Sequence, residues 1–199
     1  MGGAPDPAPA HAGFDEDLRV DWLAAEELGD GLPGRLGMTF LPGKRGASNR
    51  YPGHVYRRDT AADLSTMLRL GIVRLVLLVE DRELERWADP AIVDIGARLG
   101  LDVRRHPIPD GRAPASLEQM DAILADVREG RRSGDVAVAC MGGVGRTGTV
   151  ASCALVAAGL AARQAIERVR AVRHPTAVET AAQERFVSGF ERRERGIES

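Results

Sequence analysis

The stretch that decides the fold lies at residues 136–148 and reads VAVACMGGVGRTG. Its first residues are apolar and of strand length, and the glycines that follow favour a turn. From about Arg146 to Ala158 the side chains are small or apolar nearly all round, which is typical of a buried helix. The sequence therefore predicts a buried strand, a glycine-rich turn and a buried helix. Cys140 opens the turn and Arg146 closes it.

Further strand and helix patterns lie on both sides of this stretch. Aliphatic runs predict strands at 36–41, 72–79 and 101–107, with a polar basic turn at 42–46. Capping residues and apolar periodicity predict helices at 59–70, 87–99, 116–132, 161–172 and 179–195. Strands that alternate with helices favour an α/β fold, in which a central, mostly parallel sheet is flanked by helices on both faces.

Length and composition limit the class of protein. The 199 residues suggest one domain at 14–199, preceded by a disordered tail at 1–13 that is rich in proline, alanine and glycine. A net charge of −2 gives no electrostatic case for binding nucleic acid. No apolar run is long enough to insert into a membrane, and no signal peptide is visible, so a cytoplasmic location is expected. The sequence carries no signal for an oligomeric state.

The turn after Cys140 has the composition of an anion-binding site. Its glycines let successive backbone N–H groups point inward, and the following helix adds its positive end. Arg146 can bind two phosphate oxygens in parallel. The predicted phosphate ligands are Met141, Gly142, Gly143, Val144, Gly145 and Arg146. The positive end of the helix and the guanidinium of Arg146 also favour the thiolate of Cys140. This thiolate could attack a bound phosphorus and form a phosphocysteine.

Other interpretations of these residues remain open when each is taken alone. Cys140 could be a small buried hydrophobe, and Arg146 could pair with any carboxylate. Residues 143–148 also match the G-x-G-x-x-G fingerprint of dinucleotide-binding folds, but too little chain follows to build such a fold. No lysine follows the glycines, which excludes a Walker A loop. The combination of nucleophile, glycines and arginine favours a phosphate site.

Residues 140–146 form the C-x5-R signature of the protein tyrosine phosphatase superfamily, and the chain resembles its dual-specificity branch, most of all the kinase-associated type. Supporting segments occur in the family's order. They are Trp22-Leu23, 41–44, 59–79, 106–111, 140–146 and 179–183. The resemblance covers roughly residues 20–192. It implies a metal-independent phosphatase fold without a cofactor, acting on a phosphorylated protein or peptide.

The resemblance also implies roles outside the turn. Asp110 would be the general acid that protonates the leaving oxygen and later the base that activates water, although Asp110-Gly111 could be a simple turn. Gln183 matches a position that orients this water, and the alternative is an exposed helix glutamine. Thr147 could donate its hydroxyl to the cysteine sulfur. Lys44 and its neighbour Arg45 could meet the substrate, but a solvated turn is favoured.

One residue departs from the family pattern. The family carries a histidine before the cysteine that orders the loop, and this chain has Ala139. The expected activity is hydrolysis of phosphotyrosine, with phosphoserine and phosphothreonine as further substrates. The alternatives are a phosphate-binding pseudophosphatase or scaffold, and a phosphatase of a small ester such as a phosphoinositide. The second cysteine, Cys153, falls on an apolar helix face, where core packing is favoured over a redox role.

Overall fold

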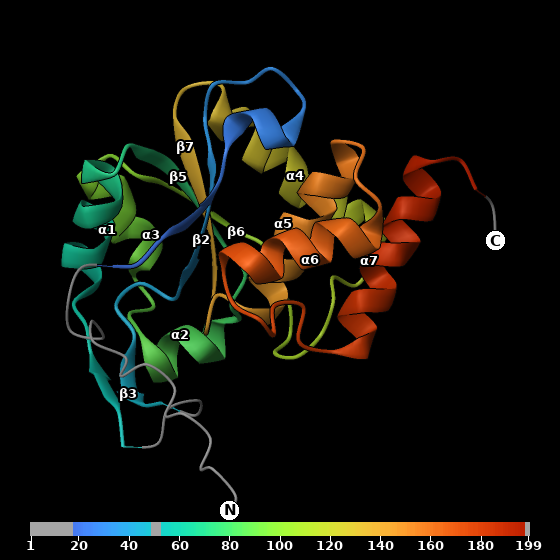
Figure 1. The fold of residues 1–199 in the computed structure, drawn as a ribbon. Coiled ribbons are helices and arrows are strands. Elements are labelled where there is room, and N and C mark those ends of the chain that lie inside the picture. Colours follow the sequence, from blue (N-terminus) through green and yellow to red (C-terminus); the bar gives the residue numbers. More distant parts are fainter. Residues whose placement is uncertain (1–17, 49–52, 198–199) are drawn as a thin grey trace, which may run out of the picture.

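A computed structural model describes residues 18–48 and 53–197, so the tail predicted at 1–13 lies outside the described residues. The main sheet has five strands in the order β1–β2–β7–β5–β6 (Figure 1). Their bounds are β1 Asp21–Leu23, β2 Leu36–Phe40, β5 Ile72–Leu77, β6 Asp102–Arg105 and β7 Asp135–Cys140. All neighbours are parallel except β1, which pairs antiparallel with β2. The predicted mostly parallel sheet is confirmed.

Helices cover both faces of this sheet (Figure 1). Helices α1 (Thr60–Arg69) and α3 (Ile92–Leu99) lie on one face. The other face carries α4 (Leu117–Arg131) and α5 (Gly145–Ala157), and outside them α6 (Ala162–Val172) and α7 (Ala181–Glu194). No helix in the described ranges is long and apolar enough to cross a membrane.

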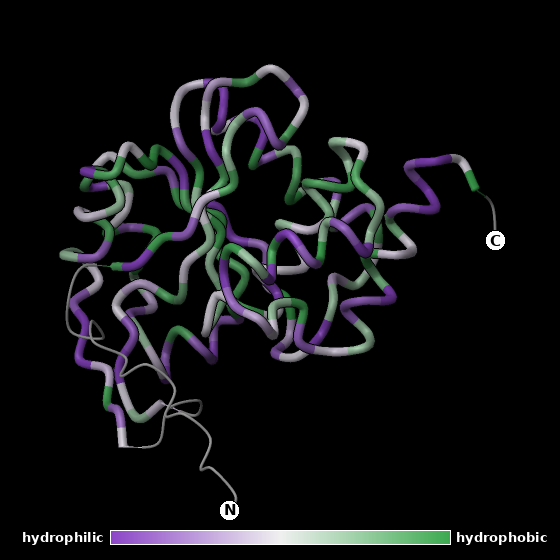
Figure 2. Tube along the Cα trace, in the orientation of Figure 1, coloured by the Kyte–Doolittle hydropathy of each residue, from purple (hydrophilic) through white to green (hydrophobic). Residues whose placement is uncertain are grey.

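The strand that ends at Cys140 lies at the centre of the molecule. β7 pairs with β2 on one side and with β5 on the other, and every residue from Val136 to Cys140 is buried. A parallel strand covered on both faces has no polar side, which explains its continuous apolar sequence. In Figure 2 the hydrophobic colour gathers on the central strands, whereas the end of α7 is hydrophilic. The helix α5 that follows is buried from Gly145 to Cys153, as predicted.

Helices α1 and α4 each begin at a side-chain cap, and Asp59 rather than Thr60 caps α1. Asp59 accepts a hydrogen bond from the backbone N–H of Ala62 at the start of α1. Ser116 accepts one from the N–H of Gln119 at the start of α4. Each cap pairs a backbone donor that the helix itself cannot satisfy.

The single helix predicted at 87–99 is wrong. The chain forms α2 (Asp81–Trp87), breaks, and forms α3 from Ile92. Pro90 lies in the break, where its ring removes one donor and disfavours helical geometry in the preceding residue. The α2 segment is mostly charged, so it lacks the apolar periodicity that identifies a helix in a sequence.

The turn predicted at 42–46 is also only partly right. Its last residues belong to β3 (Arg45–Ala47), which pairs antiparallel with β4 (Val55–Arg57) in a separate two-stranded sheet. Gly46 in β3 has a positive φ of 93°, and a Cβ there would come within 2.7 Å of the Trp87 ring. The hairpin therefore packs against α2, and this tertiary contact stabilises strands too short to show a clear pattern.

Candidate active site

The predicted nucleophile lies where parallel α/β sheets bind ligands, at the carboxyl ends of their strands. Cys140 is the last residue of β7 and is only 3% exposed. Residues 141–144 join it to α5. Met141 and Gly142 of this loop line an open pocket of about 290 Å³, and its other lining residues include Lys44, Trp87, Asp110 and Glu179. The structure thus brings Asp110 to the same pocket as Met141, the residue that directly follows Cys140.

The backbone of the loop provides a row of hydrogen-bond donors. Among the described residues, the N–H groups of residues 141–146 donate no hydrogen bond. Runs of unpaired amides are rare, because a backbone N–H without a partner costs free energy when water cannot reach it. Gly143 has a φ of 66°, and a Cβ there would come within 2.3 Å of the Thr39 carbonyl oxygen. The geometry therefore fits an oxyanion bound by the loop amides.

Arg146 is held rigidly beneath the pocket. Its side chain is 2% exposed, and its two Nη atoms donate to the two carboxylate oxygens of Glu83, both at 2.7 Å. Nη1 also donates to the carbonyl of Ile108 at 2.9 Å, and Nη2 donates to Oδ1 of Asp110 at 2.8 Å. Burial alone would lower the pKa of Arg146, but the hydrogen bonds that its guanidinium donates to Glu83 and the negative charges of Glu83 and Asp110 raise it. The guanidinium is therefore fixed in position and always charged.

Asp110 stands at the mouth of the pocket on an anchored loop. Its side chain is 76% exposed, although one carboxylate oxygen contacts Arg146. The loop that carries it is tied to α7, because Thr180 donates to the carbonyl of Gly111 at 3.3 Å and Gln183 donates to that of Arg112 at 3.1 Å. An accessible carboxylate on a tethered loop can exchange protons with a group bound over Cys140.

Gln183 is not the exposed glutamine that was one alternative. It is fully buried, and its Oε1 accepts hydrogen bonds from the N–H groups of Glu179 at 2.8 Å and Thr180 at 3.3 Å. A Cβ on Gly145 would come within 3.2 Å of the Gln183 amide. The side chain therefore joins the start of α7 to the Asp110 loop and lies against the phosphate loop.

Two expected contacts differ in the structure. The hydroxyl of Thr147 is buried and has no hydrogen-bond partner within residues 18–48 and 53–197, so the expected bond to the cysteine sulfur is not formed. The solvated turn favoured for Lys44 is wrong, because Lys44 is only 8% exposed and its ammonium lies 4.2 Å from the centre of the Tyr56 ring. A cation over an aromatic face is attracted by the ring quadrupole. Lys44 therefore lines the pocket in a defined position.

The two cysteines are both buried, but Cys140 ends β7 next to the pocket-lining residue Met141, whereas Cys153 lies inside α5. Cys153 is fully buried in α5, and this burial raises the pKa of its thiol. We expect native protein at mildly alkaline pH to take up one equivalent of iodoacetamide, at Cys140, and to take up two after unfolding. Peptide mapping by mass spectrometry checks this, and rapid native alkylation of Cys153 would contradict it.

Sequence reasoning missed three residues that shape the site. Glu83 and Trp87 lie on α2, a helix that was not expected. Arg173, at the end of α6, donates to two carbonyl groups of the phosphate loop. The pair Glu80 and Glu83 forms a capping box, which was the one local signal for α2.

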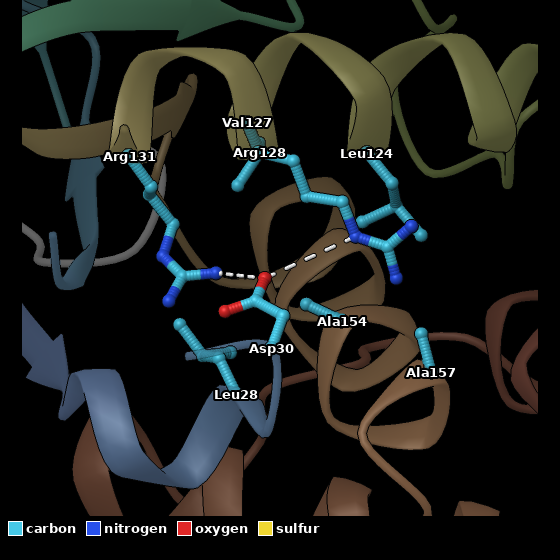
Figure 3. A pocket seen from close by; sticks show the side chains of 8 residues that line it. All are labelled: Leu28, Asp30, Leu124, Val127, Arg128, Arg131, Ala154 and Ala157. Atoms are coloured by element: carbon cyan, nitrogen blue, oxygen red, sulfur yellow. Dashed lines mark hydrogen bonds and ion pairs between the residues drawn. The ribbon is translucent and has the colours of Figure 1, made fainter. Parts of the chain in front are cut away.

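A second cavity lies away from this pocket, between α4, α5 and the 3-10 helix η1 (Ala25–Leu28). Figure 3 shows Asp30 between Arg131 and Arg128, and Asp30 accepts from Nη1 of Arg131 at 2.7 Å. The cavity holds about 10 Å³, room for about one water molecule. It is therefore a packing feature rather than a substrate site.

Comparison with known proteins agrees with this geometry. Residues 52–187, more than half of the chain, match the family model of the Swiss Army Knife protein DSP-PTPase phosphatase domain. The chain belongs to this phosphatase family. It is therefore a protein-tyrosine or dual-specificity phosphatase, and the resemblance drawn from the sequence is confirmed.

Individual relatives extend the match beyond the family domain. The phosphatase is 28% identical to rat (Rattus norvegicus) cyclin-dependent kinase inhibitor 3 over 87% of this chain and 78% of the relative. Its fold matches a crystal structure of kinase-associated phosphatase, with a TM-score of 0.74 and 23% identity over 92% of this chain and 98% of that one. It also matches Tk-PTP in its active form, at 34% identity and a TM-score of 0.64, over 80% of this chain and 93% of that one.

Proposed function

We propose that the phosphatase hydrolyses phosphotyrosine esters in proteins or peptides through a phosphocysteine on Cys140, with phosphoserine and phosphothreonine as further substrates. The observation that carries this proposal is that the amides of residues 141–146, beside the buried Cys140, have no hydrogen-bond acceptor in the described part of the chain, next to the buried, charged Arg146 side chain. Amides aimed at one point in a partly dry site stabilise the charge of a transferring phosphoryl group.

In the first step the loop amides and Arg146 hold the phosphate. The sulfur of Cys140 attacks phosphorus, the bond to the leaving oxygen breaks, and Asp110 donates a proton to that oxygen. In the second step water attacks the phosphocysteine, Asp110 accepts its proton, and the thiolate leaves with release of inorganic phosphate. Gln183 is proposed to assist this step by positioning the water.

The contact between Asp110 and Arg146 defines the state of the site before phosphate binds. Asp110 occupies a hydrogen of Nη2, one of the donors that a bidentate phosphate would use. A phosphate dianion can replace it, because Asp110 is the exposed partner and Glu83 keeps hold of the guanidinium from the buried side. Displaced towards the mouth, Asp110 lies beside the leaving oxygen.

Activity on matched substrates tests the proposal. Purified protein is assayed with p-nitrophenyl phosphate, with phosphotyrosine, phosphoserine and phosphothreonine forms of one peptide, and with soluble phosphoinositides. We expect turnover of the phosphotyrosine peptide to be fastest and unchanged by EDTA, because no step uses a metal. Faster turnover of a phosphoinositide would instead assign the site to small phosphate esters.

Replacing Asp110 with asparagine removes the proton donor and keeps the size of the side chain. We expect kcat on a phosphotyrosine peptide to fall by about 10² to 10³-fold. The loss on p-nitrophenyl phosphate should be smaller, because nitrophenolate leaves without protonation. A kinetic comparison of the two substrates checks this, and equal losses on both would argue against a general acid at this position.

The alternative of a phosphate-binding pseudophosphatase rests on Ala139. This residue is fully buried in β7, beside the cysteine, and offers no side-chain donor to order the loop. Absence of turnover, together with protection of Cys140 from alkylation by inorganic phosphate, would favour that function over hydrolysis.

A further inference from the structure

We infer that Arg173, anchored by Asp21 of the first strand, is the positioning residue that aims the loop amides at the phosphate; the inference rests on the proposed function. Arg173 directly follows α6, and its side chain is only 7% exposed. Its Nε donates to the carbonyl of Gly143 at 2.9 Å, and Nη2 donates to that of Gly142 at 3.3 Å. The opposite side of the guanidinium pairs with Asp21 at 2.7 Å.

The geometry of the peptide bond turns these contacts into an effect on the amides. In a trans peptide the C=O of one residue and the N–H of the next point in opposite directions. Holding the carbonyl of Gly142 outward therefore turns the N–H of Gly143 inward. Holding the carbonyl of Gly143 outward likewise turns the N–H of Val144 inward. Both amides lie in the row that donates no hydrogen bond among the described residues.

Without such a contact the loop could easily turn these peptides around. The loop is rich in glycine, which adopts positive and negative φ with similar ease. A rotated peptide would present a carbonyl oxygen to the phosphate and repel it. The guanidinium favours the observed state because its donors match two adjacent carbonyl oxygens at once.

Asp21 holds the arginine in turn. The two residues are 152 positions apart in the chain, and Asp21 lies in β1, before the residues that match the family model. Asp21 also accepts a hydrogen bond from Arg19 at 3.0 Å, but the Arg19 side chain is 65% exposed and reaches no part of the loop. The loop therefore has a source of order that does not depend on residue 139, where the family's histidine is replaced by Ala139.

The test compares Arg173→Met, Arg173→Lys and Asp21→Asn with the native protein, and uses Arg19→Met as the matched control. Methionine keeps an apolar stem but no donor, and lysine keeps the charge with donors for only part of the contact. We expect Arg173→Met to lower kcat/KM about 100-fold, as misplacement by about 1 Å can do. Arg173→Lys should recover part of this loss, and Asp21→Asn should lose about 10-fold. Arg19→Met should match the native protein.

Two readouts separate positioning from stability. The rate of Cys140 alkylation against pH should move to a higher midpoint in Arg173→Met and Asp21→Asn, because fewer amides face the thiolate, and inorganic phosphate should protect less. Both readouts work even if the native protein shows no turnover, so failure of the proposed function is seen separately. If Arg173→Met does not fold, the inference is tested with Asp21→Asn and Arg173→Lys. Unchanged alkylation midpoints and phosphate protection in the folded variants would overturn the inference.

Discussion

Cys140→Ser is expected to lower kcat on p-nitrophenyl phosphate by at least about 10⁴-fold, because removal of a catalytic nucleophile costs about that much or more. A serine hydroxyl stays protonated at neutral pH and is a weak nucleophile without an adjacent base. The oxygen is also smaller and less polarisable than sulfur. The loss should appear in kcat rather than in phosphate affinity, since the amides and Arg146 remain.

Two measurements make this result specific. Inorganic phosphate should still raise the melting temperature of Cys140→Ser, because ligand that binds only the folded state stabilises it. Cys153→Ala serves as the control, since its thiol is buried away from the pocket, and it should keep kcat close to the native value in spite of some loss of stability. Undiminished turnover in Cys140→Ser would remove the phosphocysteine from the mechanism.

Arg146→Lys should have the second largest effect, a fall in kcat/KM of about 10³-fold. Lysine keeps the charge but cannot match the five hydrogen bonds of the guanidinium. Two of these go to Glu83, and one each goes to Leu78, Ile108 and Asp110. The ammonium would be drawn to the buried carboxylate of Glu83 and away from the phosphate. We also expect the buried Glu83 to lose part of its pairing and the protein to lose about 3 kcal/mol of unfolding free energy.

Arg168→Lys is the matched control for this substitution. Arg168 pairs with Glu27 on the surface at 2.5 Å, so the same chemical change there should leave both activity and stability nearly unchanged. Steady-state kinetics and urea unfolding measure the two effects separately. An Arg146→Lys variant with native kcat/KM would show that a positive charge at this position is sufficient for activity. The bidentate geometry of the guanidinium would then not be required.

The sequence predicted the central part of the molecule well. The aliphatic runs at 72–79 and 136–140 correspond to β5 and β7, since strands covered on both faces are mostly apolar. The glycines and the C-x5-R spacing placed the phosphate loop, because that geometry depends on neighbours in the chain. The same holds for the caps at Asp59 and Ser116, each of which bonds an amide three residues away.

The remaining parts of the site depend on contacts between distant segments. α2 is too polar to show an apolar face, yet it supplies Glu83, whose side chain is almost as buried as that of Arg146. The hairpin β3–β4 forms against Trp87, and Lys44 is drawn over Tyr56, so a segment that reads as a polar turn becomes a pocket wall.

The loop at residues 140–146 depends on both local sequence and long-range contacts. The sequence predicts Cys140, Arg146 and the glycines between them as the residues that carry the chemistry, because a nucleophile, a phosphate-binding arginine and a flexible backbone are local properties. Only the tertiary structure decided how the loop is held, through Glu83 beneath Arg146 and through Arg173 and Asp21 behind the glycines. An ion pair between residues far apart in the chain has no local sequence pattern. Its energy depends on the burial of the two groups and on the distance between them, and both are set only when the chain folds.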